Sequence, residues 1–376
     1  MNFRIHTNLL KYRTNMKTKG NFLTLKRSIL TSLGLLFFTQ VGFSQGVDLD
    51  RFFFKANYRN LPQSPLGFDY KTYKVNPSLS KITASLFSPE EIQDKIIIEG
   101  FSRVDNDSAD LAVSLNVDDI VITRTEIKTR QDVKKDKNGT ITSKKDYYWL
   151  EMDYTMSAKF NVVDLKKHVT LSSRVLDNRE NKHTYKSEET ESYKSARDLY
   201  QLNKEMMVKN LIQSCLNDYY SYINNFLTTN YGYKVISENL QLWILGSKKH
   251  PETAAYSNVC KQIQDAFKLM NPDSSVAAIK ESLTPVFEYL NNIPQRYQSD
   301  EKGDKKLRYS AYYNLAQMYL ALDMPDEAIK CANLIITNDY DTRDGNYFIA
   351  NAQKLKDLFA KNNFYSRHFV RDVQIF

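Results

Sequence analysis

Residues 312–335 read YYNLAQMYLALDMPDEAIKCANLI, and the spacing of large and small side chains in this stretch decides how the last third of the chain folds. Offsets 0, 3, 4, 7, 16, 20 and 23 are occupied by Tyr312, Leu315, Ala316, Tyr319, Ala328, Ala332 and Ile335. Offsets of three and four residues place side chains on one face of a helix. Pro325 marks the start of a second helix. The small alanines allow two helices to approach closely, so the stretch predicts a helical hairpin.

This pattern of large and small residues resembles one tetratricopeptide repeat. One period of 34 residues later, Ile349-Ala350 falls in the same register as Leu315-Ala316, which favours a further, capping helix. Upstream, residues 278–280 echo residues 328–330. The resemblance implies stacked helical hairpins whose concave face usually holds a peptide or a partner protein. The alternative is a helical spacer that binds nothing.

The whole of residues 247–376 has a helical pattern. We expect helices at about 252–270, 274–292, 305–322, 326–338 and 345–361. The tail, residues 367–376, is apolar enough to dock against the protein rather than extend into solvent. Residues 246–251 are small, charged and interrupted by a proline, so they are the predicted domain boundary.

Residues 46–190 alternate β-branched or aromatic residues with polar ones, as half-buried strands do. Asn138-Gly139 predicts a tight hairpin turn, and Ser88 with Glu91 predicts a capping box before a short helix. The predicted strands are Arg51–Tyr58, Tyr70–Val75, Lys95–Phe101, Leu111–Ile127, Tyr147–Val163 and His168–Val175.

A long helix is expected over about 195–227, followed by a closing strand at 233–245. Spacings of three and four residues connect Val208, Leu211, Cys215, Tyr219, Tyr222 and Phe226 in one apolar stripe. We expect this stripe to pack against the sheet. The predicted fold is therefore α+β: a mixed sheet with a long packing helix over 45–246, then an all-α domain of tetratricopeptide-like hairpins over 247–376.

The order of elements over roughly 47–245 is similar to the periplasmic α/β domain of curli-secretion lipoproteins and penicillin-binding-protein activator lipoproteins. The chain differs from both families because no lipid-accepting cysteine follows the predicted cleavage site. The membrane anchor of those families is therefore not implied for this chain.

Residues 1–44 have the pattern of a secretory signal peptide. Lys26-Arg27 precedes a short apolar run, and small residues follow at Gly42 and Ser44. We expect cleavage after Ser44, with translation starting at Met1 or at Met16. The apolar run is shorter than the roughly 20 residues that a membrane-spanning helix requires, and no second such run is present.

The basic charge of the chain resides in this leader. The sequence has 52 Lys+Arg and 44 Asp+Glu, a net charge of +8. Seven basic and no acidic residues precede residue 45, which leaves 45 basic and 44 acidic residues after it. A nearly neutral chain lacks the electrostatic footprint of nucleic-acid binding.

The sequence has no recognisable catalytic or cofactor motif. Ser78 and Lys81 match the Ser-x-x-Lys motif of penicillin-recognising enzymes, but its companion motifs are missing. His168 and His183 lack the third and fourth ligands that a zinc site requires, and we expect the histidines to lie at the surface. Residues 105–110 carry clustered oxygen donors without the glycine and closing glutamate of a calcium loop.

Cysteine and aromatic residues leave further alternatives. Cys215, Cys260 and Cys331 lie in apolar helical patterns, and we expect buried free thiols, although one disulfide among them is not excluded. Tyr147-Tyr148-Trp149 and the tyrosines of residues 219–222 predict either packing or an aromatic surface that stacks on sugars.

The sequence thus predicts a non-enzymatic, exported scaffold or adaptor without cofactor or metal, which binds other envelope proteins through its helical repeat. Its expected location is the periplasm of a Gram-negative bacterium or the periplasmic face of the outer membrane, in peripheral association. A glycan-binding module, or a serine-type cell-wall enzyme using Ser78 and Lys81, is the alternative.

Overall fold

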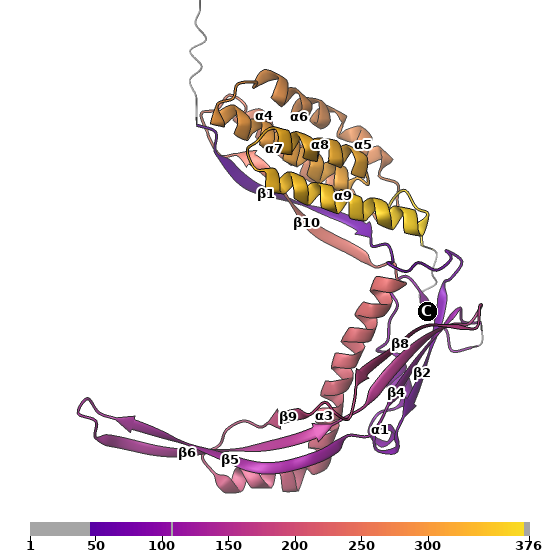
Figure 1. Ribbon diagram of the computed structural model, residues 1–376, viewed down its shortest axis with the longest axis vertical. Helices are drawn as coiled ribbons and strands as arrows, with labels where there is room; N and C mark the ends of the chain where they lie inside the picture. Colours follow the sequence, from indigo (N-terminus) through magenta and orange to yellow (C-terminus); the bar gives the residue numbers. More distant parts are fainter. Residues whose placement is uncertain (1–45, 107, 372–376) are drawn as a thin grey trace, which may run out of the picture. The chain divides into compact units, whose positions relative to one another are not determined.

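The computed structural model describes residues 46–106 and 108–371 and has the predicted α+β fold (Figure 1). Residues 1–45, which contain the predicted leader, and residues 372–376 lie outside the described part. Strands form a five-stranded sheet, a three-stranded sheet and a two-stranded ribbon. Two hydrophobic cores organise the elements: one beneath the larger sheets, the other among the C-terminal helices.

The five-stranded sheet is mixed and has the order β3-β2-β4-β7-β8. β2 pairs in parallel with β3 and β4, whereas β4-β7 and β7-β8 are antiparallel. β4 is buried along most of its length because helix and strands surround it, as its apolar run requires. The strands are β2 (Thr72–Leu79), β3 (Ser102–Arg103), β4 (Leu111–Val117), β7 (Ala158–Asp164) and β8 (Val169–Asp177).

The three-stranded sheet is built on a long hairpin of β5 (Val121–Lys135) and β6 (Ile141–Thr155), with β9 (His183–Lys186) on the far side of β6. Its turn contains Asn138-Gly139, as predicted, and Gly139 has φ +82°. The Asp136 carboxylate closes the turn by accepting hydrogen bonds from the main-chain N–H groups of Asn138 and Thr140.

Helix α3 (Tyr193–Asn230) covers these sheets, and its predicted stripe packs on them. Leu211, Cys215 and Tyr219 are buried, while Tyr222 is half exposed at the edge of the stripe. Two short helices, α1 (Lys81–Leu86) and α2 (Pro89–Gln93), follow β2. The predicted capping box at Ser88 is present, because the Ser88 and Glu91 side chains each accept from the other's main-chain N–H.

One predicted strand, Lys95–Phe101, is wrong. Its alternation is real, since Ile96 and Ile98 are buried, but its main-chain groups bond outside any ladder. Asn224 on α3 accepts from Ile97 N–H at 2.9 Å and donates to the Lys95 carbonyl at 2.8 Å. Two other predicted strands are each divided in two by turns, at residues 118–120 and 156–157.

β1 (Leu49–Arg59) and β10 (Val235–Leu245) form an antiparallel ribbon of their own, without a third strand among the described residues. Their apolar faces, Phe54 and Ala56 on β1 and Leu240 and Leu242 on β10, belong to the core of the C-terminal helices. Sequence alternation identifies both segments as strands but not the core that receives them. The domain division at residue 246 stays a prediction.

The C-terminal helices follow the predicted pattern closely. The expected helix at 274–292 is two helices, because Pro285 provides no N–H for the hydrogen bond that would continue the first one. The helices are α4 (Thr253–Lys268), α5 (Ala277–Ser282), α6 (Thr284–Arg296), α7 (Lys302–Ala321), α8 (Pro325–Thr337) and α9 (Thr342–Asn362).

The described part of the tail docks, as predicted. Arg371 is buried among the rings of Phe68, Phe101 and Tyr233, with its guanidinium 4.5–5.1 Å from their centroids. It donates hydrogen bonds to the carbonyls of Gly100 and Phe68 at 3.0 and 2.9 Å, and to that of Tyr70. The tail therefore ties the last helix to the loops that flank the front sheet.

Cys215, Cys260 and Cys331 are buried free thiols, and no disulfide occurs among them. Burial raises the pKa of Cys260 and of Cys331 to about 12, so both are protonated at neutral pH.

Across the described residues, no helix is both long and apolar enough to cross a membrane.

Gly345 provides a test of the close α8–α9 contact. A Cβ at Gly345 would lie 2.7 Å from the Ala332 carbonyl oxygen and 2.5 Å from Ile336 Cγ1. Gly345→Ala should therefore lower the free energy of unfolding by about 1–3 kcal/mol, measured by urea denaturation. Gly303→Ala on α7 is the control, because its Cβ meets only Val47 at 3.6 Å. That change should be neutral or stabilise by about 0.5 kcal/mol. Equal effects would contradict the packing.

Candidate functional site

The seven residues of the predicted repeat meet at the α7–α8 hairpin. Leu315, Ala316, Ala328, Ala332 and Ile335 are fully buried there. Tyr312 and Tyr319 are partly buried and pack against the same core, with Tyr319 stacked on Phe287 of α6 at 5.0 Å. These side chains hold the hairpin together and leave the opposite face of α7 for other contacts.

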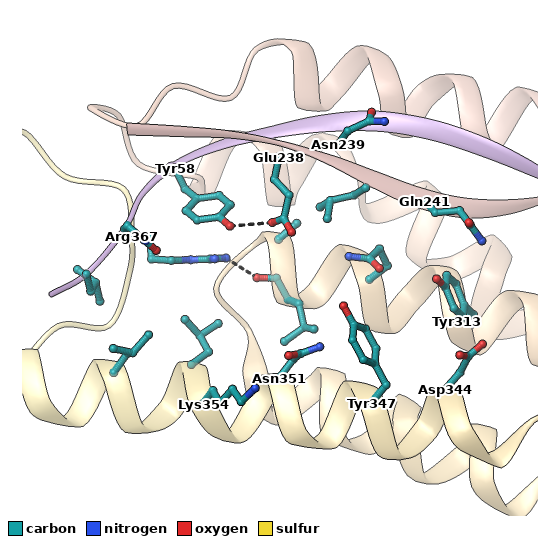
Figure 2. Close-up of a pocket in the computed structure, with 18 residues that line it drawn as sticks. Tyr58, Glu238, Asn239, Gln241, Tyr313, Asp344, Tyr347, Asn351, Lys354 and Arg367 are labelled. Atoms are coloured by element: carbon teal, nitrogen blue, oxygen red, sulfur yellow. Dashed lines mark hydrogen bonds between the residues drawn. The ribbon is translucent and has the colours of Figure 1, made fainter. Parts of the chain in front are cut away.

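A groove with a cavity of about 550 Å³ lies between the β1–β10 ribbon and the facing sides of α7 and α9 (Figure 2). Most of its polar lining consists of tyrosines and carboxamides, to which Glu238, Asp344, Lys354 and Arg367 add charge. The lining carboxamides are Asn60, Asn239, Gln241, Gln317 and Asn351, and the tyrosines are Tyr58, Tyr313 and Tyr347.

β10 forms one wall of the groove and is held against α7 by Asn314. The Asn314 carboxamide accepts from the main-chain N–H of Trp243 at 2.7 Å and donates to the Trp243 carbonyl at 2.8 Å. A side-chain amide that bonds both groups of one residue imitates a neighbouring strand at that residue. The lining residues Glu238, Asn239, Leu240 and Gln241 come next along β10.

α9 forms the opposite wall, where Tyr347, Asn351 and Lys354 recur at spacings of four and three residues. Figure 2 shows Tyr347 and Asn351 directed from α9 toward the ribbon. The Tyr347 side chain is 60% exposed, which leaves its ring accessible to a ligand. Asp344, one turn earlier, accepts a hydrogen bond from the Tyr309 hydroxyl of α7.

Tyr58, Glu238 and Arg367 close one end of the groove (Figure 2). The Tyr58 hydroxyl donates to Glu238 at 2.7 Å, and the Arg367 guanidinium lies 3.9 Å from the centroid of the Tyr58 ring. Burial and the hydrogen bond to Glu238 raise the pKa of Tyr58 to about 12, although the charge of Arg367 opposes them. Tyr58 is therefore a neutral hydrogen-bond donor at physiological pH.

Asp323 fixes Arg367 in this position. Its buried carboxylate accepts hydrogen bonds from the Arg367 guanidinium and main-chain N–H, both at 2.6 Å, and lies 3.0 Å from His368 Nδ1. Burial alone would raise the Asp323 pKa, but the hydrogen bond with His368 and the charge and hydrogen bonds of Arg367 lower it to about 2.

Gln317 is the most informative residue of the lining. Only 9% of it is exposed, yet its carboxamide has no hydrogen-bond partner among the described residues. A buried amide without a partner is costly, of the order of 1–3 kcal/mol, unless water or a ligand bonds it. The groove that it lines is the place from which such a partner would come.

The chemistry of the groove is that of recognition. Among the described residues that line it there is no serine, threonine, cysteine or histidine to act as a nucleophile or base. Burial also raises the pKa of Tyr313 to about 12, so its hydroxyl stays neutral. Neutral hydroxyls and amides, with a few charges, donate and accept hydrogen bonds without transferring groups.

Ser78 and Lys81 do not form the catalytic arrangement that their motif requires. Ser78 lies in β2 and Lys81 begins α1, so they are not one turn apart on a helix. Both are exposed, and Lys81 lacks the desolvation that would make its amine a base.

The histidines and the acidic loop have structural positions. The expectation of surface histidines is wrong for His250 and His368, which are buried; His168 and His183 belong to different sheets. Asp110, in the proposed acidic loop, accepts from the main-chain N–H groups of Lys71 and Thr72, which leaves it committed to the fold.

The aromatic residues of β6 are partly covered by cations. Arg130 lies 4.6 Å from the Tyr147 centroid, and Lys186 lies 4.2 Å from that of Trp149. Tyr148 contacts Tyr193 edge to face. The rings that the sequence offered for sugar stacking are therefore used in packing, whereas the accessible ring of Tyr347 was not singled out.

Comparison with known proteins gives little. No protein family and no curated protein match the sequence. Among solved structures, the chain is similar to the crystal structure of a homologue of a neuraminyllactose-binding hemagglutinin from Helicobacter pylori. Identity is 13%, the TM-score is 0.23, and the match covers 45% of this chain and 90% of that one. At this level the similarity carries no argument about function.

The low pKa of Asp323 predicts acid sensitivity of the groove end. Because the pKa is below its usual value near 4 in the folded state, the stabilisation is present above about pH 4 and is lost as the pH falls toward 2. The loss should be about 2 kcal/mol in urea denaturation. Asp323→Asn should be less stable at pH 7 and show a shallower decline between pH 4 and 2. A decline as steep as that of the unmodified protein would contradict this assignment.

Proposed function

We propose that this protein is an exported, non-enzymatic adaptor of the bacterial envelope that holds a segment of a partner protein in the groove between the β1–β10 ribbon and helices α7 and α9. The leader pattern over residues 26–45 supports export, to the periplasm or the periplasmic face of the outer membrane. The helical hairpin resembling a tetratricopeptide repeat supports partner binding. In this role the front sheet docks on an assembly while the groove receives the partner segment.

The unpartnered amide of Gln317 is the observation that carries the proposal. A purely structural helical spacer has no use for a buried carboxamide without a hydrogen bond, because the amide lowers its stability. A bound polypeptide supplies N–H and C=O groups along its whole length and would satisfy this amide. The accessible Tyr347 ring across the groove supplies the apolar contact that protein interfaces favour.

A glycan is the second candidate for the same groove. Five carboxamides and two carboxylates can bond sugar hydroxyls, and Tyr347 offers a ring for stacking. Isothermal titration with envelope oligosaccharides would distinguish the candidates, since a sugar ligand should give saturable binding that Tyr347→Ala abolishes. The serine-enzyme alternative has no support from the positions of Ser78 and Lys81.

Site-specific photocrosslinking in cells tests the adaptor role. Replacement of Tyr347 with p-benzoylphenylalanine should yield a discrete crosslinked protein on irradiation, because this side chain is 60% exposed in the groove. The same replacement at Tyr222 on α3, which is 50% exposed and outside the groove, is the matched control.

The second change, Gln317→Leu, should weaken the Tyr347 crosslink without unfolding the protein, since it removes an amide that bonds no described residue. Equal crosslinking from Tyr347 and Tyr222, or a Tyr347 crosslink unaffected by Gln317→Leu, would contradict a partner in the groove.

A further inference from the structure

The hydrogen bonds around the ribbon reveal which way each main-chain group of β10 points. In an antiparallel pair, directly opposed residues alternate between bonding each other and pointing outward. The Trp243 N–H and C=O point outward, because Asn314 bonds both. On β1, the Phe53 and Asn57 carbonyls also point outward, to Gln264 and to His368.

The register then places Gln241 and Asn239 in the same outward series as Trp243. Phe53 is opposite Gln241, and Lys55 is opposite Asn239, without a register shift along the ribbon. The N–H and C=O groups of Gln241 and Asn239 therefore point away from β1. They have no partner among the described residues, and both residues line the groove.

We propose that the partner segment lies in the groove as an extended strand that pairs with Asn239 and Gln241 and adds a third strand to the ribbon. This inference rests on the proposed function and specifies how the segment is held. Unpaired groups on an accessible edge strand are a template for another extended chain. A segment in this position exchanges hydrogen bonds with β10 and places its side chains toward α9.

Asn314 sets the limit and register of this pairing. Its carboxamide already occupies the strand position beside Trp243, so an incoming strand begins to pair at Gln241. Beyond Asn314 on α7, one turn further along, the Gln317 amide is free to bond the same segment. One helix thus supplies both the group that ends the pairing and a group that extends it.

Charge at the α9 wall indicates the chemistry of the segment. Lys354 lines the groove and has no carboxylate within 4.0 Å among the described residues, whereas the Arg367 guanidinium is paired with Asp323. Glu238 and Asp344 each already accept a tyrosine hydroxyl. The segment that fits best therefore carries an acidic side chain opposite Lys354.

Alternate N-methylation of a bound peptide tests the pairing directly. The probe is an octapeptide selected from a random display library on the immobilised, purified full-length chain, then synthesised with each main-chain nitrogen methylated in turn. We expect binding, measured by fluorescence anisotropy, to weaken about tenfold or more at every second position and to persist at the positions between. Neutralising its acidic residue should also weaken binding, and Lys354→Ala should remove that effect.

Two proline variants supply the matched control in the protein. Asn239→Pro removes an outward N–H on the groove edge, whereas Lys55→Pro removes the outward N–H of the residue directly opposite, on the other edge of the ribbon. Neither N–H belongs to the ladder, so circular dichroism should show both variants folded. Asn239→Pro should weaken the peptide about tenfold, and Lys55→Pro should leave it unchanged.

The outcomes separate this inference from the proposed function. Peptide binding that tolerates N-methylation everywhere and is insensitive to Asn239→Pro would overturn strand pairing, while the Tyr347 crosslink would still support a partner in the groove. Loss of that crosslink and failure to select any peptide would overturn both. A dimer in sedimentation that Asn239→Pro dissociates would assign the edge to a second copy of this chain and contradict a partner segment.

Discussion

The pairing of β1 with β10 is the constraint on which the rest of the structure depends. These strands begin and end a segment of almost 200 residues, and the main-chain N–H of Asp48 still reaches the hydroxyl of Ser247, 199 positions away. Closing so long a loop costs conformational entropy, which grows only slowly with loop length. Burial of Phe54, Leu240 and Leu242 among the C-terminal helices offsets it.

The ribbon also determines where a ligand can bind. One face packs on α4 and α7, so a groove remains at the free edge of β10, where α9 provides the second wall. The tail completes the end of that groove: Arg367 is clamped by Asp323 and stacks on Tyr58, while Arg371 inserts among aromatic rings beside the front sheet. The same chain segment thus shapes the groove and attaches the helices to the loops of the front sheet.

Much of the fold could be predicted from local pattern. The long helix, the Asn138-Gly139 hairpin, the capping box at Ser88 and the C-terminal helices depend on periodicity and turn chemistry, which neighbours along the chain determine. Lys95–Phe101 has the alternation of a strand, but its hydrogen bonds go to Asn224, more than 120 residues away. Partners at that distance leave no local signal.

The groove was harder to predict for the same reason. The repeat pattern identified the residues that pack α7 on α8, and these form the support of the site. Asn314 and Gln317 lie within the quoted stretch, but on the helix face opposite the repeat pattern, where polar residues usually meet solvent. Only the position of β10 shows that one amide completes a strand edge and that the other is buried without a partner.

Residue-resolved hydrogen exchange of β10 in the free protein tests the central claim, an open strand edge in the groove, most directly. The account predicts slow exchange for the amides of Leu240 and Leu242, which bond β1, and for Trp243, which bonds Asn314. The amides of Asn239 and Gln241 should exchange far faster. Equal protection of all five would mean that the edge is already covered and would contradict the account.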